Sequence, residues 1–382
     1  KRFLTLFEEF RVQYDKDLNE REQIDFADMM AMSVSLLREG KYESPYRAII
    51  VDEYQDISRA RARLLDELHE NKPDTRLLCV GDDWQSIYRF SGSDLTLTTK
   101  FEERHEDTIR TDLDKTFRFK DKLLDLSSTF VTQNPNQLKK TITTNQVSQL
   151  AAVYITSESV EKVLDKLKKE KLNQNGNKQV CVLGRYRHTF EDIRTKYKST
   201  VHSAKGLEWD YVVVPDLIAD TWGFPCPKED DPNVAMLLPT ADTFPFSDER
   251  RLFYVALTRA REEVWLIVPK NKSPSAFIEE LLKGVMYKGL VVTRDLDINL
   301  DAQCPECKSL MRRRENSKTG EPFFACVHFP RCRGSRPGCR HCEKGALTRK
   351  AARVSCSNTF CDGIDRSCPR CETGILVRKK NG

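Results

Sequence analysis

The sequence predicts an α/β protein made of two parallel-sheet domains, followed by a cysteine-rich module. Two observations carry the α/β prediction: apolar runs of four or five residues show no in–out alternation, and helical patterns separate them. Such runs are typical of strands buried in a parallel sheet, and their alternation with helices is typical of α/β domains. The third observation is that ten of the 13 cysteines lie between Cys304 and Cys371.

Taken in order, residues 1–47 have helical apolar spacing, and the run at residues 48–51 predicts a first buried strand. A helix is expected over residues 58–70 and a second buried strand over residues 76–80. Further strands are predicted at residues 152–156, 180–183, 211–214 and 264–268. Helical patterns cover residues 160–172, 248–257 and 273–283, and residues 290–300 are expected to be extended. We expect the α/β part to end near residue 300.

The composition is that of a highly charged protein with enough apolar residues for sizeable cores, since 39% of its 382 residues are hydrophobic and 32% are charged. There is no run of about 18 apolar residues and no signal-peptide pattern, so we expect no membrane partner and a cytoplasmic location. The first residue is Lys1 rather than Met, and we therefore expect the chain to begin inside a longer protein.

The charge is unevenly distributed. From Cys304 to the end there are 18 Lys and Arg against 7 Asp and Glu, a net +11, whereas the remainder has 45 against 51, a net −6. A basic tail favours an anionic partner such as nucleic acid. Eight cysteine thiolates around two zinc ions would reduce this excess by about four charges.

The first chemical motif is the sequence VDEYQD at residues 51–56, at the end of a predicted buried strand. Nucleotide hydrolysis needs Mg²⁺ near the phosphates and a carboxylate that orients the attacking water. Open α/β sheets bind ligands at the carboxyl ends of their strands, so Asp52 is a candidate for Mg²⁺ and Glu53 for the water. Taken alone, the motif is equally compatible with a surface turn.

The second motif is GDDWQSIYRFSG at residues 81–92, again just after a predicted strand. A DEYQD sequence followed by a GDD-x-QSIY sequence resembles motifs II and III of the UvrD/Rep/PcrA helicases. The resemblance implies two RecA-like domains with ATP bound between them. It also implies that Gln85 senses the γ-phosphate and that Tyr88 and Phe90 lie against single-stranded DNA.

The aromatic pair suits this role because aromatic faces stack on any base without reading its sequence. Core packing is the alternative for Tyr88 and Phe90. The chain departs from the family at two places, with Phe90 in place of the usual Trp and Ser91 in place of the following Arg. We expect stacking to survive the first change, and the charge of that Arg to be missing.

The sequence LDKTFR at residues 113–118 is similar to motif IV, although only the Leu and the Arg match outright. The resemblance implies that Arg118 reaches the γ-phosphate from the second domain. A guanidinium is suited to stabilising charge spread over the transferred phosphoryl oxygens.

The sequence TVHSAKGLE at residues 200–208 resembles motif V nearly residue for residue. The resemblance assigns Thr200 and His202 to the DNA backbone, and Gly206 and Glu208 to the nucleotide. Short polar side chains suit contacts to phosphate that carry no base readout. The alternative for His202 is an ordinary solvated histidine.

The sequence ERRLFYVALTRAR at residues 249–261 resembles motif VI, in which Arg259 would be the arginine finger. Such a residue contributes about 10³–10⁵ in rate in phosphoryl-transfer enzymes. We expect Arg250 and Arg251 to make structural ion pairs instead.

No phosphate-binding loop of the form G-x-x-x-x-G-K-[ST] occurs in the sequence. Since the family carries this loop well before motif II, we expect a first RecA-like domain truncated at its N-terminus over residues 1–113, and poor ATP hydrolysis by the chain alone. The second RecA-like domain is expected over residues 114–300 without a large inserted subdomain, because only 81 residues separate Arg118 from Thr200. This layout is most similar to that of bacterial helicase IV enzymes.

The cysteines of the tail form two complete sets with metal-ligand spacing. The first set consists of Cys304, Cys307, Cys326 and Cys332, and the second of Cys339, Cys342, Cys356 and Cys361. Four thiolates make a closed structural zinc site, so we expect zinc ribbons over residues 301–337 and 338–382. Disulfides are the alternative, and His328 or His341 could replace a thiolate. Cys368 and Cys371 form a lone half-set that is either vestigial or part of a third site.

The spacing around Cys326 and Cys332 resembles the C-terminal zinc ribbons of type IA topoisomerases, which bind single-stranded DNA. On that reading, arginines contact phosphates and phenylalanines stack on bases. The residues concerned are Arg312, Arg313, Arg314, Arg331, Arg333, Arg336, Phe323, Phe324 and Phe329. A protein-docking module with solvated arginines is the alternative.

Together these motifs predict part of an ATP-dependent 3′→5′ DNA helicase that acts on single-stranded and duplex DNA, with ATP, Mg²⁺ and Zn²⁺ bound. The direction of movement comes from the resemblance alone. A non-catalytic single-stranded-DNA-binding protein derived from a helicase is the alternative. Retention of Glu53, Arg118 and Arg259 argues against it, because a pure binder does not need them. A helicase fused to a nuclease is a further alternative, but no separate cluster of acids supports it.

Overall fold

The computed structural model describes most of the chain in two compact units. The described residues are 2–148, 150–172, 178–270, 272–284, 287–293, 296, 299–327, 329, 332–342, 345–350, 353–357, 361 and 364–366. The first unit contains Lys1–Arg110 and Asp230–Ala241, and the second contains Thr111–Glu229 and Asp242–Gly382. Cys368 and Cys371 lie outside the described residues, as do His328 and Arg331. Within the described part, none of the helices has the length and apolar character needed to cross a membrane.

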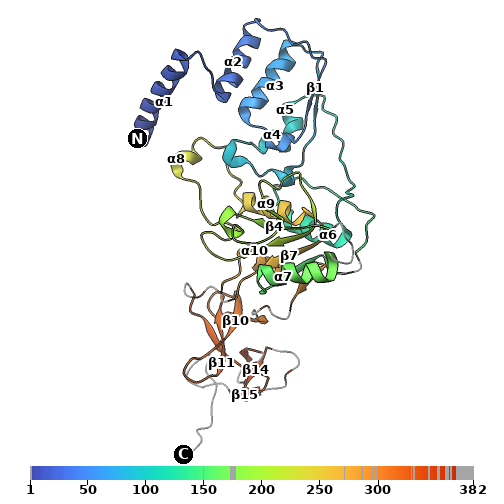
Figure 1. Ribbon diagram of the computed structural model, residues 1–382, viewed down its shortest axis with the longest axis vertical. Coiled ribbons are helices and arrows are strands. Elements are labelled where there is room, and N and C mark those ends of the chain that lie inside the picture. The colour runs from blue at the N-terminus through green and yellow to red at the C-terminus, as the bar shows by residue number, and fades with distance from the viewer. Residues whose placement is uncertain are drawn as a thin grey trace, which may run out of the picture. The chain divides into compact units, whose positions relative to one another are not determined.

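The first unit consists of helices and a small two-stranded parallel sheet (Figure 1). Its α-helices are α1 (Arg2–Glu20), α2 (Phe26–Arg38), α3 (Arg59–Asn71), α4 (Thr96–Thr99), α5 (Phe101–Arg104) and α8 (Pro232–Ala235). Its strands are β1 (Ala48–Val51) and β2 (Arg76–Cys79), and its 3-10 turns are η1 (Tyr54–Asp56), η2 (Asp83–Gln85) and η3 (Arg89–Ser91). Asp25 begins α2 with a capping box and Ser58 caps α3, so polar side chains define where these helices start.

The strands β1 and β2 pair in parallel as predicted, with Ala48 opposite Arg76 and Val51 opposite Cys79. The prediction that both are buried is wrong, because Ile50 is 71% exposed and Leu78 is 56% exposed. In the described residues only one face of this two-stranded sheet is packed. Side chains alternate between the faces of a strand, so Val51 and Cys79 join the packed cluster while their neighbours point outward.

The second unit contains a six-stranded sheet in the order β5-β4-β6-β7-β3-β8, and every neighbouring pair is parallel. Its strands are β3 (Val153–Thr156), β4 (Val180–Gly184), β5 (Tyr197–Thr200), β6 (Trp209–Val214), β7 (Ala260–Ile267) and β8 (Leu290–Val292). Its helices and shorter turns are α6 (Asp121–Val131), α7 (Val160–Leu167), η4 (Lys168–Leu172), η5 (Arg187–Thr189), α9 (Ser247–Leu257) and α10 (Ala276–Lys283). Strand β5 and helix α6 were not expected from the apolar pattern.

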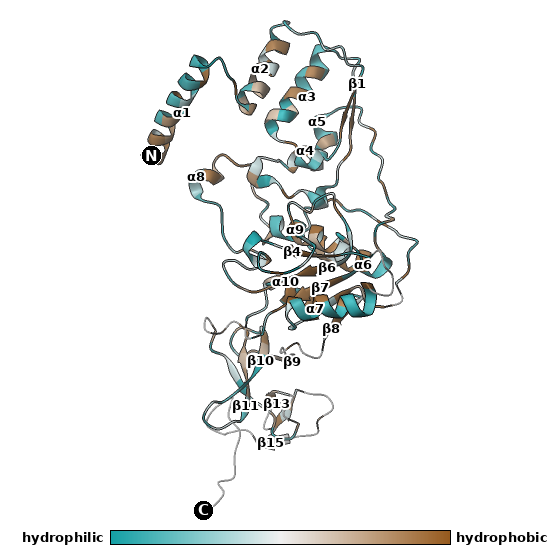
Figure 2. Ribbon diagram, in the orientation of Figure 1, coloured by the Kyte–Doolittle hydropathy of each residue, from teal (hydrophilic) through white to brown (hydrophobic). Residues whose placement is uncertain are grey.

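The core of this unit explains its strand pattern. Every residue of β4 is buried, and β6 and β7 are brown along most of their length in Figure 2. Helix α7 covers the sheet through Val163, Leu164 and Leu167, while its outer face is hydrophilic. The continuous apolar runs therefore predict these strands correctly, since the sheet is covered on both faces.

Helix α9 is buried from Arg250 to Leu257, although it carries two arginines. Arg250 donates to both carboxylate oxygens of Glu280, at 2.9 and 2.6 Å. Arg251 pairs with Asp248 and donates to Gln137 at 2.9 Å. The prediction that these two arginines make structural ion pairs is confirmed. A buried guanidinium needs such partners, because an unpaired buried charge is very costly.

The cysteine-rich region forms two antiparallel sheets. Strands β9 (Asn299–Gln303), β10 (Leu310–Glu315), β11 (Pro322–Cys326) and β12 (Ser335–Pro337) make the first, and β13 (Leu347–Lys350), β14 (Arg353–Cys356) and β15 (Ile364–Arg366) make the second. In the first sheet, Met311, Phe324 and Cys326 pack in a small core. Small domains of this kind have little apolar core, so metal ligation is a common additional source of stability.

Candidate functional site

The residues predicted for Mg²⁺ and water lie directly after β1. Asp52 and Glu53 are both exposed, and the Glu53 amide donates to Asp52 Oδ1 at 2.8 Å. Glu53 has a φ of 50°, in the left-handed region that non-glycine residues seldom adopt. The chain thus turns sharply at the carboxyl end of the strand, and both carboxylates stand outside the packed cluster.

A chain of hydrogen bonds links Glu53 to Gln85 through two residues that the sequence analysis did not single out. Gln55 Nε2 donates to Glu53 Oε2 at 2.5 Å, and Gln55 Oε1 accepts the Asp82 amide at 2.9 Å. Gln85 Nε2 in turn donates to Asp82 Oδ2 at 2.7 Å. The structure therefore brings the two predicted residues of motifs II and III together. The available sequence signal was the polar residue Gln55, two positions after Glu53 in the DEYQD motif. In the structure its side chain is 1% exposed.

Close packing at Gly81 keeps the two motifs together. A Cβ atom at this position would lie 2.7 Å from Gln55 Oε1 and 3.1 Å from the Gln55 backbone nitrogen. The Tyr54 amide also donates to the Val80 carbonyl at 2.9 Å. A side chain at residue 81 would push the Gln55 carboxamide away from its partners, which favours glycine here.

The predicted DNA-stacking pair lies on the surface rather than in the core. The Tyr88 and Phe90 ring centroids are 6.0 Å apart with a 60° angle between planes. Phe90 is 61% exposed and Tyr88 is half-buried. The core-packing alternative is therefore excluded for Phe90.

In the second unit, Glu208 lies between two guanidinium groups. Arg118 Nε donates to Glu208 Oε2 at 2.7 Å, and Arg261 Nη2 donates to Glu208 Oε1 at 2.5 Å. The hydrogen bond from Arg261, followed by that from Arg118, holds the pKa of Glu208 below its ordinary value. The resemblance assigns Arg118 to the γ-phosphate and Glu208 to the nucleotide sugar. In the structure these two side chains are hydrogen-bonded to each other.

Arg259 is 1% exposed and lies inside the second unit. Its side chain donates to the carbonyl of Val255 at 3.1 Å and to the carbonyl of Leu207 at 3.2 Å. The Trp209 amide donates to the Arg259 carbonyl at 2.9 Å. These contacts tie motif VI to motif V, and they fix the guanidinium in one place.

The motif V residues lie at the carboxyl edge of the six-stranded sheet. Thr200 ends β5 opposite Gly184 of β4, and the Thr200 hydroxyl accepts from the Ser203 amide at 3.2 Å. His202 is half-buried, and Gly206 is exposed with a φ of 81°. Parallel sheets bind ligands at this edge, so the location agrees with a binding role for Thr200 and His202.

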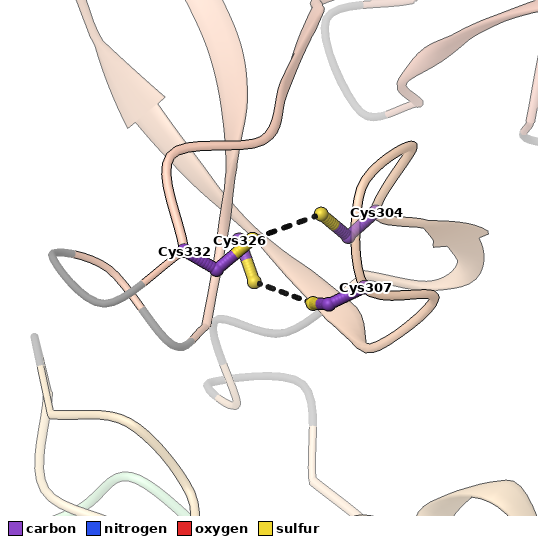
Figure 3. Close-up of side chains that lie close together, drawn as sticks. All are labelled: Cys304, Cys307, Cys326 and Cys332. Atoms are coloured by element: carbon purple, nitrogen blue, oxygen red, sulfur yellow. Dashed lines mark hydrogen bonds between the residues drawn. The ribbon is translucent and has the colours of Figure 1, made fainter.

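Each of the two cysteine sets forms a cluster in which every pair of sulfur atoms lies within 4.8 Å. Figure 3 shows the first cluster, in which Cys304, Cys307, Cys326 and Cys332 point toward one another. The Sγ atoms of Cys304 and Cys332 are 3.6 Å apart, and those of Cys307 and Cys326 are 3.4 Å apart. The second cluster has separations of 3.7 Å for its first and fourth residues and 3.6 Å for its second and third.

These separations fit a metal site. Four thiolates at about 2.3 Å from a tetrahedral zinc ion lie about 3.8 Å from one another, whereas a disulfide brings sulfur atoms to about 2.05 Å. Burial opposes ionisation at Cys307, but hydrogen bonding from Ser309 lowers the pKa of its thiol to about 6. The four-cysteine sets would hold zinc with no open position, which suits a structural ion.

The structure corrects two of the DNA contacts predicted for the first ribbon. Arg312 is 3% exposed and donates to the carbonyl of Lys272, so it cannot reach a phosphate. Phe324 is 1% exposed and packs in the small core of the ribbon. The resemblance from which these contacts were predicted does not show which positions of β10 and β11 are covered. In the same ribbon Arg333 is exposed and Phe329 is 49% exposed.

The other side chains predicted to contact DNA in the first ribbon are in part engaged with groups of the protein. Arg313 pairs with Glu315 at 3.0 Å, and the Arg314 guanidinium lies 5.5 Å from the Phe329 ring centroid. Arg336 Nε donates to the Gln303 carbonyl at 2.8 Å, and Phe323 is half-buried.

Comparisons with known proteins agree with the motifs. The family profile of the UvrD/REP helicase N-terminal domain matches residues 1–106, and that of the UvrD-like helicase C-terminal domain matches residues 197–271. DNA helicase IV of Escherichia coli (strain K12) is 38% identical over 275 residues, which are 69% of this chain and 40% of that protein. DNA helicase II of Rickettsia typhi (strain ATCC VR-144 / Wilmington) is 29% identical over 185 residues, which are 44% of this chain and 27% of that protein.

The chain thus spans less than half the length of these two relatives. Among solved structures, that of PRRSV helicase aligns with 58% of this chain and 35% of its own at 17% identity. Its TM-score of 0.33 is too low to support an argument about the fold.

Proposed function

The chain belongs to the UvrD/REP family of superfamily 1 DNA helicases, and we propose on this premise that it acts in an ATP-dependent motor that moves 3′→5′ along single-stranded DNA and unwinds duplex DNA. The activity is a proposal because the chain spans 40% of the length of E. coli DNA helicase IV. The polarity rests on the family alone.

The observation that carries the proposal is the hydrogen-bonded chain from Glu53 through Gln55 and Asp82 to Gln85. In the proposed reaction Asp52 holds Mg²⁺, Glu53 orients and deprotonates the attacking water, and Gln85 contacts the γ-phosphate. A fixed relation between the water-activating carboxylate and the phosphate sensor provides the positioning on which phosphoryl transfer depends.

The second unit is proposed to supply the positive charge that stabilises the γ-phosphate during hydrolysis. Arg118 and Arg259 are proposed to stabilise the charge on the γ-phosphate, while Gly206 and Glu208 are proposed to face the remainder of the nucleotide. For Arg259, which is 1% exposed, this role requires its guanidinium to exchange its bonds to the Val255 and Leu207 carbonyls for bonds to phosphate. For Arg118 this requires exchange of its bond to Glu208 for one to phosphate. A guanidinium matches the two-oxygen geometry of either partner, so the exchange is chemically simple.

Single-stranded DNA is proposed to lie against Tyr88 and Phe90 in the first unit and against Thr200 and His202 in the second. The exposure of Phe90 supports stacking, and the location of Thr200 at the sheet edge supports contact with the phosphate backbone. The zinc ribbons are proposed to add DNA affinity through exposed groups such as Arg333 and Phe329.

The test is ATP hydrolysis and strand displacement by the intact protein with Glu53→Gln, compared with Glu70→Gln on the exposed face of α3. We expect Glu53→Gln to abolish DNA-stimulated hydrolysis while single-strand binding is retained, and Glu70→Gln to behave as wild type. Duplexes with a 3′ tail should be unwound and those with a 5′ tail should not. Wild-type protein that binds single strands without hydrolysing ATP would favour the non-catalytic DNA-binding alternative.

A further inference from the structure

Three aromatic side chains without a role in the motifs gather in the second unit. The rings of Tyr186 and His188 are stacked, with centroids 5.5 Å apart and planes 13° apart. Trp222 stands nearly perpendicular to both, at 5.3 Å and 80° from Tyr186 and at 5.5 Å and 89° from His188. The three centroids thus form an almost equilateral triangle.

The cluster lies at the carboxyl edge of the six-stranded sheet, beside motif V. Tyr186 and His188 follow β4, whose last residue, Gly184, is the register partner of Thr200. The Val201 amide donates to the Gly184 carbonyl at 3.0 Å, so the two strands remain paired to their ends. The loops after β4 and β5 therefore start side by side.

Trp222 comes from the loop after β6, the other neighbour of β4 in the sheet. It lies in a tight turn in which the Gly223 amide donates to the Asp220 carbonyl at 3.0 Å. A Cβ atom at Gly223 would lie 1.9 Å from the Ile218 carbonyl oxygen, so only glycine allows this turn. The turn fixes the backbone at Trp222, and the Trp222 ring packs against Tyr186 and His188.

Exposure separates Trp222 from the other tryptophans of the chain. It is 50% exposed, whereas Trp84, Trp209 and Trp265 are exposed by 0%, 7% and 4%. Phe224, two residues later, is 1% exposed and packs in the core. Large aromatic side chains held together on the surface are more typical of binding sites than of a core.

The exposed cations beside the rings suit an anionic ligand with flat rings, while Asp216, whose charge interacts with His188, is half-buried. The Lys228 ammonium group lies 3.8 Å from the Trp222 ring centroid, and the Arg185 guanidinium lies 4.7 Å from the Tyr186 centroid. Arg187, between Tyr186 and His188, is exposed. Glu249 binds Arg185 with two hydrogen bonds and so offsets its charge, which leaves Arg187 and Lys228 as the surface cations of the cluster.

We propose that Tyr186, His188 and Trp222 form a base-stacking site for single-stranded DNA, with Lys228 and Arg187 beside the phosphates of the same strand. The inference rests on the proposed function and deepens it, because no motif residue of the second unit stacks on a base. Aromatic groups combined with surface cations are the usual means of holding a single strand without sequence preference. Rings already fixed against one another lose little conformational freedom on binding.

The site complements the neighbouring motif. Thr200 and His202 would hold the phosphate backbone at the end of β5, and the aromatic cluster would take a base at the ends of β4 and β6. Backbone contacts position a strand, and stacking adds affinity that is the same for every sequence. This combination is what a motor that passes along any sequence needs.

Intrinsic fluorescence provides a direct test, because Trp222 is the one tryptophan of the four with substantial exposure. Iodide in solution quenches exposed tryptophan only, so the emission that it quenches is that of Trp222. We expect an oligothymidylate to quench this Trp222 emission and to protect Trp222 from iodide. An abasic strand of the same length should bind through phosphates alone and leave this emission unchanged. Equal quenching by the abasic strand would show that the base does not stack on Trp222 and would overturn the proposal.

Affinity measurements with variants make the test independent of fluorescence. Trp222→Ala should weaken oligothymidylate binding by about 5- to 150-fold, the range for loss of stacking on one base, whereas Trp222→Phe should stay close to wild type. Tyr46→Ala is the matched control, because Tyr46 is 52% exposed in the first unit. Emission from the three buried tryptophans reports whether each variant is folded.

The outcomes separate the two proposals. Wild-type chain that does not bind oligothymidylate would contradict the proposed function itself. Two results together would overturn the stacking site alone and leave the proposed function standing. They are wild-type affinity in the Trp222→Ala variant, and Trp222 emission in the wild-type chain that oligothymidylate does not quench.

Discussion

Replacement of Gln55 by Glu tests the hydrogen-bonded chain between motifs II and III. The substitution keeps the shape of the side chain and keeps an oxygen that can accept the Asp82 amide. It changes the other contact, because the nitrogen that donates to Glu53 Oε2 at 2.5 Å becomes an oxygen. Two carboxylates at this distance cannot both be ionised, so they must share a proton, and the pKa of the pair rises.

The magnitude follows from the burial of Gln55, which is 1% exposed. A rise of about two pKa units above the ordinary value for Glu, near 4.3, corresponds to about 2.7 kcal/mol. Since the folded variant then holds more protons than the unfolded chain, its free energy of unfolding falls as the pH increases from about 4 to about 6. Below this range the variant should be nearly as stable as the wild type, and at neutral pH it should show the full loss. The substitution should also impair the proposed water-activating role of Glu53, so DNA-stimulated ATP hydrolysis by the intact protein should fall.

Amide hydrogen exchange over residues 48–56 measures the local free energy of opening, since these amides include those of β1 and η1. The matched control is Gln13→Glu on the exposed side of α1, which corrects for the added charge and for the effect of pH on exchange itself. We expect protection in Gln55→Glu to decrease with pH relative to this control. The same pH dependence in both variants would refute the argument that Gln55 bridges the two motifs.

Three further predictions concern the zinc sites, Arg118 and the first ribbon. Combined replacement of Cys326 and Cys332 by Ser should reduce bound zinc, measured by elemental analysis, from two ions to about one per chain. It should also weaken single-strand binding and flatten its salt dependence, whereas unchanged binding would favour a protein-docking ribbon. Arg118→Ala in the intact protein should lower the kcat of ATP hydrolysis by about 10³-fold or more and leave nucleotide-free DNA affinity unchanged; equal loss of both would argue for a structural role. Arg312→Ala should lower the free energy of unfolding by about 1.5–3 kcal/mol without changing the salt dependence of DNA binding, since Arg312 is 3% exposed. Arg333→Ala should flatten the salt dependence of DNA binding without changing the free energy of unfolding, since Arg333 is exposed.

The strands of the second unit were predictable because their apolar runs match a sheet covered on both faces. The same kind of run gives a wrong prediction of burial at β1 and β2, where Ile50 and Leu78 point away from the packed face. An apolar run indicates that a strand could be buried on both sides, but it carries no information about whether both sides are covered. Strand β5 was missed because its sequence, YKST, is largely polar and half-buried, and pairing with β4 alone establishes it.

The site residues were predictable where a sequence motif is specific. Their hydrogen-bond partners were less predictable, because tertiary packing determines which residues meet. Glu53 and Gln85 were identified from their motifs, but the bridge through Gln55 and Asp82 depends on how two strand ends meet. The two cysteine sets were predictable because ligand spacing is a local property of sequence. The burial of Arg312 was not, because its partner, the Lys272 carbonyl, is 40 residues away in the chain.

The arrangement around Glu208 explains how Arg118 could be available for a nucleotide. Glu208 carries one negative charge between two guanidinium groups, so the three side chains together carry a net charge of +1. If Arg118 turned to a phosphate, Glu208 would keep Arg261 as its partner and would not be left unpaired. Loss of a single partner from a simple ion pair leaves the other charge uncompensated, which is the main cost of breaking such a pair. The second arginine removes most of that cost, and the side chain of Glu208 is also 34% exposed to water. In the proposed nucleotide site, Arg118 would therefore be held in position before a nucleotide binds, yet it would leave Glu208 at little expense in free energy.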